Sequence, residues 1–237
     1  MCFAPYISIS TFVIEFLLAL FFLMRNPKDK LNRIIALLSL LLGIYQLNEF
    51  LICVTNLNIF TRLAMITTAI LPSIGITYAL IIWRKKLKYY WHLLIYSPAI
   101  FFIVMFSMPF YFSNNAFCDR VFIKYPSLGL LGDFYALYYF GYIIASLILF
   151  YIAGNFDTSN KVINNKIKTS KDYKYYKGLL GLGALGMLIF TVPTYIFLQF
   201  LPSLNIEFSS VLCEFALLLA IELIIVIWYK EKYKLEF

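Results

Sequence analysis

Residues 60–83 read FTRLAMITTAILPSIGITYALIIW, and RKKLK follows directly at 84–88. A helix of roughly 20 mostly apolar residues is long enough to cross the hydrocarbon layer of a membrane, which is about 30 Å thick. The chain holds seven runs of this kind, at residues 5–24, 34–55, 60–83, 92–110, 128–152, 178–200 and 208–229. The pattern therefore predicts an all-α protein, in which residues 1–237 form one bundle of seven transmembrane helices.

The bulk composition supports a membrane protein. Hydrophobic residues make up 62% of the chain and charged residues 14%, whereas soluble domains have about one half and one quarter. The mean hydropathy is +0.83. The net charge of +8 does not indicate nucleic-acid binding, because the chain has no nucleic-acid-binding module and no basic face. We expect the lipid bilayer as its partner and no nucleic acid.

The basic residues predict the orientation of the chain. All but three of the 20 Lys and Arg residues follow the first, third, fifth or seventh apolar run, and the exceptions are Arg62, Arg120 and Lys124. Basic residues in short loops stay on the cytoplasmic side of a membrane. The sequence thus predicts a multi-pass protein of the cell membrane, with its N-terminus outside and its C-terminus in the cytoplasm.

Five acidic residues fall within the predicted spans, and they are the main candidates for functional residues. They are Glu15, Glu49, Asp133, Glu214 and Glu222. The only Lys or Arg inside the predicted spans is Arg62, at the start of the third one. Acids within a span face the bundle interior, face a water-filled cavity, or are protonated. The predicted orientation places Glu49, Asp133 and Glu214 in the outer third. Glu15 at mid-depth and Glu222 in the inner half are interpreted individually as structural.

The second helix shows the sharpest polar pattern. Gln46, Glu49 and Cys53 are spaced i, i+3 and i+7, which places them on one helix face. The candidate ligand pocket, open to the outside, consists of residues at similar depth: Gln46, Asn48, Glu49, Thr68, Asp133, Thr194, Tyr195 and Glu214. The alternative is an interhelical hydrogen-bond network, in which each bond contributes about 0.6 kcal/mol. Both interpretations stay open.

All four cysteines are predicted to lie at the outer face, where disulfides can persist. The favoured hypothesis is at least one disulfide that ties Cys118, in the outer loop, to a helix end. Cys2, Cys53 and Cys213 are the other candidates, and sequence does not choose among the pairings. Buried free thiols are one alternative. A metal or redox site that combines Cys53 and Cys213 with Glu49 or Glu214 is another, although no cofactor is expected.

Two further segments have an expected role. The glycines that open the sixth helix predict close helix packing; they are Gly178, Gly181, Gly183 and Gly186. The polar connection at 154–177 is expected to be a solvated linker, with a docking site for a cytoplasmic partner as the alternative.

Known membrane enzymes are not supported by the residues present. The only histidine, His92, lies at the cytoplasmic start of the fourth helix, so neither a His-ligated zinc hydrolase nor Ser–His catalysis has its residues. We therefore expect that the protein is not an enzyme.

Short motifs resemble two groups of proteins. The opening Met1–Phe3, Gln46-x-x-Glu49 and Cys213–Ala216 resemble a group of uncharacterised prokaryotic membrane proteins that open Met-Cys-Phe, in particular an archaeal branch. This resemblance implies a seven-helix membrane protein and no specific activity.

The second resemblance concerns the start of helix two. Asn26-Pro27, Asn32-Arg33 and the mid-helix Pro72 are similar to the seven-helix sensory region at the N-terminus of some histidine kinases. That similarity implies ligand sensing. No kinase domain is expected after the last helix, so the signal is expected to pass to a separate cytoplasmic partner. The favoured function is thus a seven-helix sensor with an outward-facing polar pocket for a small molecule. A small transporter or proton-coupled carrier is the alternative, ahead of a membrane enzyme.

Overall fold

The computed structural model describes residues 4–85, 87–108, 116–118, 123–125, 128–156, 170–200 and 208–235. The described part of the chain contains seven α-helices: α1 (Ala4–Arg25), α2 (Lys30–Thr55), α3 (Asn58–Ile82), α4 (Tyr89–Ser107), α5 (Leu130–Phe156), α6 (Ser170–Phe200) and α7 (Phe208–Lys232). A short hairpin lies between α4 and α5, where β1 (Phe117–Cys118) pairs antiparallel with β2 (Ile123–Lys124). The all-helical prediction is confirmed, and the hairpin is an element that the apolar pattern did not predict.

The helices α2 and α6 begin well before their apolar runs, which start at residues 34 and 178. The helix α2 begins at Lys30 because Asp29 caps it, with Asp29 Oδ1 accepting hydrogen bonds from the backbone N–H groups of Leu31 (2.9 Å) and Asn32 (3.0 Å). The helix α6 begins at Ser170, so part of the predicted linker at 154–177 is helical. No Gly or Pro interrupts residues 170–177, and helix propensity does not require apolar side chains. The apolar runs therefore predicted that these helices exist and not where they begin.

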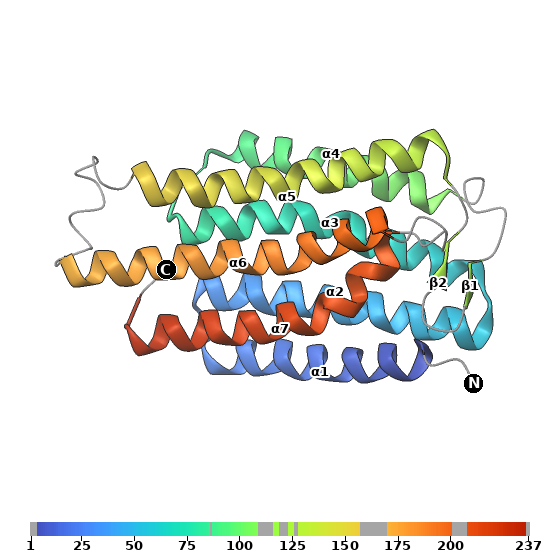
Figure 1. The fold of residues 1–237 in the computed structure, drawn as a ribbon, viewed down its shortest axis with the longest axis horizontal. Helices are drawn as coiled ribbons and strands as arrows, with labels where there is room; N and C mark the ends of the chain where they lie inside the picture. The colour runs from blue at the N-terminus through green and yellow to red at the C-terminus, as the bar shows by residue number, and fades with distance from the viewer. Residues whose placement is uncertain are drawn as a thin grey trace.

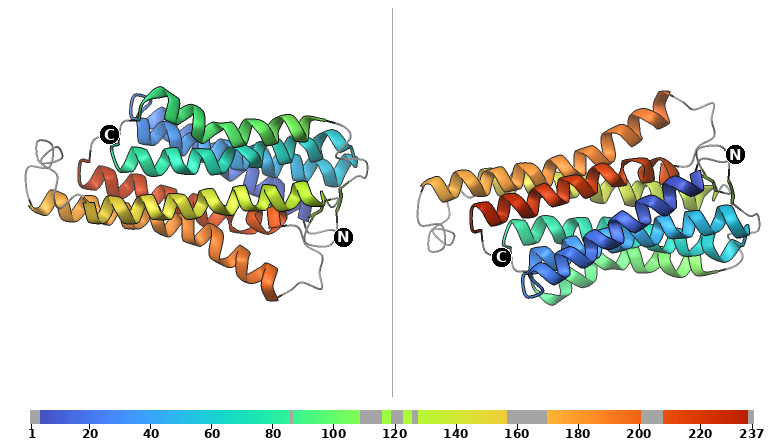
Figure 2. Two further views of the ribbon diagram at one scale, coloured as in Figure 1. Left: turned by 90° about the horizontal axis from the view of Figure 1, so that it is seen from above. Right: turned by 90° about the horizontal axis from the view of Figure 1, so that it is seen from below.

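Neighbouring helices in the sequence are also neighbours in space, and α7 returns to contact α1 and α2 (Figure 1). The helix α3 lies in the centre, in contact with α2, α4, α5 and α6. The start of α1 and the β1–β2 hairpin lie at one end of the bundle, and the end of α7 lies at the other (Figures 1 and 2). We call these the hairpin end and the C-terminal end.

The outside of the bundle is apolar along its length. Large apolar side chains such as Leu17, Leu137 and Ile144 are more than half exposed, whereas water-soluble proteins rarely expose large contiguous apolar patches. Within the described residues, the five helices α1 to α5 each contain a stretch long and apolar enough to cross a membrane. These features are those of an integral membrane protein.

Glycines bring α6 close to its neighbours, as the sequence predicted. A Cβ atom on Gly183 would lie 2.8 Å from the Phe150 ring of α5, and one on Gly186 would lie 2.5 Å from the Glu222 carboxylate of α7. A Cβ on Gly178 would overlap the Tyr229 hydroxyl. Gly181 differs, because nothing lies within 4 Å of its added Cβ. Three of the four glycines therefore form the packing face.

Ionic contacts join three helices at the C-terminal end. Lys230 Nζ of α7 lies 2.7 Å from Asp29 Oδ1 and donates to Asn32 Oδ1 (2.9 Å). Arg25 at the end of α1 forms an ion pair of 2.5 Å with Glu231. The Lys230 and Asp29 side chains are only 7% and 9% exposed, so their attraction is weakly screened. These contacts fix the end of α7 against α1 and α2.

Candidate functional site

The predicted polar face of α2 is buried and hydrogen bonded. Gln46, Asn48 and Glu49 are each at most 5% exposed. The Tyr45 hydroxyl donates to Glu49 Oε1 (2.8 Å) and lies 3.0 Å from the Tyr125 hydroxyl. Tyr45 and Glu49 are four residues apart, so they lie on the same side of the helix. The structure thus gives Glu49 a hydrogen-bond partner on its own helix.

The β1–β2 hairpin is held against this end of α2. Cys118 in β1 lies at disulfide distance from Cys53 in α2, with their Cα atoms 5.1 Å apart. Tyr125, directly after β2, is buried against the Tyr45–Glu49 pair. The structure therefore agrees with the favoured hypothesis for the cysteines, which ties Cys118 to a helix end. The metal-site alternative requires Cys53 as a thiolate, which a disulfide does not provide. Within the described residues, no group of three or more His, Cys, Asp or Glu side chains is placed to hold a metal.

The structure does not bring the whole predicted pocket together. Thr68 accepts a hydrogen bond from the Tyr135 hydroxyl of α5 (2.8 Å) and donates one to the Met65 carbonyl of its own helix (3.0 Å). The Asn48 side chain donates to the carbonyl of Ile44 on its own helix (2.8 Å). The side chains of Thr194, Tyr195, Cys213 and Glu214, and all of Cys2, lie outside the described residues.

Asp133 was predicted to line a pocket that is open to the outside. Its side chain is exposed, in the first turn of α5. A carboxylate at this position is stabilised by the positive end of the helix dipole, so it requires no partner inside the bundle.

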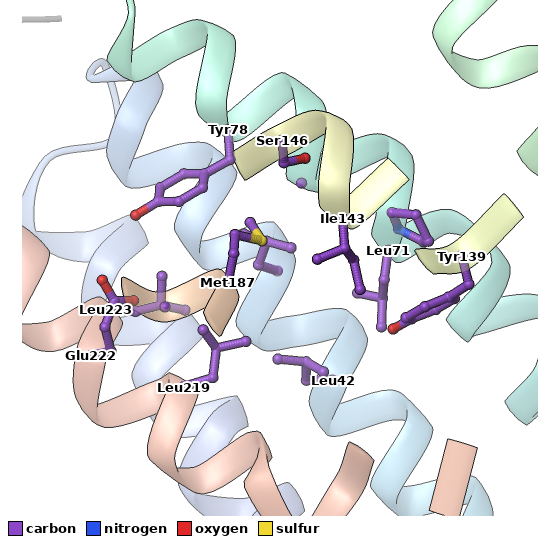
Figure 3. A pocket seen from close by; sticks show the side chains of 14 residues that line it. Leu42, Leu71, Tyr78, Tyr139, Ile143, Ser146, Met187, Leu219, Glu222 and Leu223 are labelled. Carbon is purple, nitrogen blue, oxygen red and sulfur yellow. The ribbon is translucent and has the colours of Figure 1, made fainter. Parts of the chain in front are cut away.

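A cavity of about 40 Å³ lies deeper, between α2, α3, α5, α6 and α7 (Figure 3). Its walls are mostly apolar and include Leu42, Leu71, Ile143 and Leu219. Glu222 is the only formally charged side chain among the fourteen described residues that line it. A cavity of this volume has room for about three water molecules.

Two polar groups at this cavity have no hydrogen-bond partner among the described residues. They are the carboxylate of Glu222, through both of its oxygens, and the hydroxyl of Tyr78. The two side chains are 3% and 1% exposed, and they are close enough to interact electrostatically. Buried polar groups are nearly always hydrogen bonded, and each exception requires an explanation. The unsatisfied oxygens therefore mark the cavity as a candidate site.

The carboxylate of Glu222 occupies space that a glycine leaves open. A Cβ on Gly186 would lie 2.5 Å from Glu222 Oε2 and 2.8 Å from Cδ, so any larger residue there requires the carboxylate to move. Ser146, which also lines the cavity, already donates to the Tyr142 carbonyl (2.9 Å). The absence of a side chain at Gly186 thus leaves room for the Glu222 carboxylate, which has no hydrogen-bond partner among the described residues.

Glu15 provides a useful contrast. It is fully buried against Gly43, and neither of its oxygens has a partner among the described residues. It does not line the cavity. The sequence indicated that both Glu15 and Glu222 were buried acids, but it did not show that only Glu222 faces an open space.

Comparison with protein-family models, with curated proteins and with solved structures gives no match for this chain. Its function is therefore argued from the site.

Proposed function

We propose that this protein is a seven-helix membrane sensor that binds a small molecule in the cavity at Glu222. The observation that carries the proposal is the pair of unsatisfied polar groups, Glu222 and Tyr78, at a mostly apolar cavity inside the bundle. An ionisable residue inside a membrane span is a functional candidate by default. We place the binding site at this cavity and not at the Glu49 cluster (Tyr45, Glu49 and Tyr125), because Glu49 Oε1 already accepts a hydrogen bond from Tyr45, whose hydroxyl also lies 3.0 Å from that of Tyr125.

We propose that the protein crosses the membrane seven times, with the hairpin end outside and the C-terminal end in the cytoplasm. The alternation of basic loops along the sequence supports this orientation. In this orientation Cys53 and Cys118 face an oxidising compartment, where disulfides persist.

The helix α7 offers a route from the cavity to the cytoplasm. Glu222 and Lys230 are eight residues apart on it, about 12 Å along a helix. Lys230 is bound to Asp29 and Asn32 at the start of α2. A ligand that shifts Glu222 therefore also shifts α7, and this changes the contacts of Lys230 with Asp29 and Asn32. We propose that a cytoplasmic partner reads this change at the ends of α2 and α7.

A proton-coupled carrier is the second candidate. It is favoured by the lack of any basic residue among the described cavity-lining residues, which leaves a proton as the simplest counter-charge for Glu222. A carrier moves its substrate across sealed vesicles, whereas a sensor binds its ligand without transport. Uptake measurements with the purified protein in vesicles distinguish the two.

A compound screen by thermal shift tests the proposed function, because a compound that binds only the folded protein raises its melting temperature. The variant Gly75→Ala adds a methyl group to the cavity wall, 3.4 Å from the flexible end of Met187. Gly181→Ala is the matched control, since nothing lies within 4 Å of its added Cβ. We expect compounds whose stabilisation is lost in Gly75→Ala and kept in Gly181→Ala. If every stabilising compound acts equally on both variants, the cavity is not the binding site.

A further inference from the structure

We infer that the ligand of the Glu222 cavity is a small primary amine in its protonated form, with about three non-hydrogen atoms. The inference rests on the proposed function and names the chemical class that the site accepts. Its ammonium group contacts Glu222 and Tyr78, and its short hydrocarbon part contacts the apolar wall of Leu42, Leu71 and Leu219.

The count of unsatisfied atoms indicates an ammonium group. Three buried oxygens at the cavity have no partner among the described residues: Oε1 and Oε2 of Glu222 and the hydroxyl oxygen of Tyr78. A primary ammonium carries three N–H donors and no acceptor. It satisfies all three oxygens at once, whereas an alcohol provides a single donor.

The charges around the cavity lead to the same class. Among the described residues that line it, those from α2, α3, α5 and α6 are uncharged, and the phenolic groups are those of Tyr78 and Tyr139. On α7 itself the nearest cation is Lys230, which is already paired with Asp29. A buried carboxylate is strongly destabilising without a counter-charge, and a cationic ligand supplies one. A carboxylate or phosphate ligand would instead place a second negative charge beside Glu222.

The volume sets the size of the ligand. Room for about three water molecules corresponds to a ligand of about three non-hydrogen atoms, such as ethylammonium. Longer amines need movement of wall side chains. A ligand this small reaches a Kd of about 1 mM at best. With a Kd of about 5 mM, about 50 mM of ligand raises the ratio of folded to unfolded protein about elevenfold.

The test is a thermal-shift titration of the purified full-length protein with ethylammonium chloride. Ethanol has the same size and no charge, and sodium chloride controls for ionic strength. Butylammonium and hexylammonium extend the chain. We expect ethylammonium to stabilise the protein more than ethanol does, with the effect decreasing as the chain lengthens.

Variants assign the effect to the site. Glu222→Gln, which is nearly isosteric, should remove the ethylammonium effect, and Tyr78→Phe should weaken it. Glu15→Gln is the matched control, because Glu15 is also a buried acid without a partner among the described residues but does not line the cavity. It should keep the effect. If Glu222→Gln is too unstable to measure, Tyr78→Phe together with equilibrium dialysis of labelled ethylamine decides the matter.

Three results overturn the inference, and they differ in what they leave of the proposed function. Equal stabilisation by ethanol and ethylammonium, or an ethylammonium effect that persists in Glu222→Gln, rejects the amine and leaves cavity binding in place. No response to any amine also rejects the amine. The proposed function fails with it only if the compound screen finds no compound whose effect depends on Gly75.

Discussion

Replacing Glu222 by Met should make the unliganded protein more stable. Both carboxylate oxygens lack partners among the described residues, and a buried polar group left unsatisfied costs about 1–3 kcal/mol. Met has nearly the same length and no such requirement. Its terminal methyl group must fit beside Gly186, where the space is tight, and repacking of this kind usually costs less than about 1.5 kcal/mol. We therefore expect a net gain of about 1 kcal/mol, or about 2–4 °C in the melting temperature for a chain of this size.

The assay is thermal melting of both proteins in the same detergent without added ligand. Glu49→Met is the matched control, because Glu49 accepts a hydrogen bond from Tyr45 (2.8 Å) and its loss should destabilise the protein by about 1 kcal/mol. A higher melting temperature for Glu222→Met and a lower one for Glu49→Met would support a binding role for Glu222 and a structural role for Glu49. If Glu222→Met lowers the melting temperature as much as Glu49→Met does, Glu222 has a structural partner and the reasoning fails.

Three further predictions concern the frame around the site. Lys230→Met should destabilise the protein by about 3 kcal/mol, since it leaves the buried Asp29 carboxylate without its counter-charge; an unchanged melting temperature would refute the buried pair. Cys118 should resist alkylation in non-reduced protein, and reduction should cost about 2–4 kcal/mol because the Cys53–Cys118 bond closes a loop with a sequence separation of 65; a readily alkylated Cys118 would exclude the disulfide. A reporter active only in the cytoplasm should work when fused to the C-terminus, and one active only outside should work near Asn114; the reverse pattern would overturn the orientation.

The helices could be predicted because membrane insertion depends on length and apolar content, which are readable along the chain. The glycine packing face of α6 was predictable for a similar reason, since small residues at helical spacing allow close approach whatever the partner helix is. The hairpin was not predicted, because strands of two residues leave no periodic pattern.

The rotation of each helix about its axis was much harder to predict. A helix that is apolar all round gives no amphipathic stripe to separate its interior face from its lipid face. Glu222 therefore could not be placed at a cavity from sequence, and its fit beside Gly186 depends on how α6 and α7 pair.

The most direct test of the central claim, ligand binding at Glu222, is an experimental structure of the protein with its most stabilising compound. We predict density for the compound between α2, α3, α5, α6 and α7, with a donor atom within hydrogen-bond distance (about 3 Å) of the Glu222 carboxylate. Density at the Glu49 cluster or on the lipid-facing surface, with the Glu222 cavity unchanged, would contradict it.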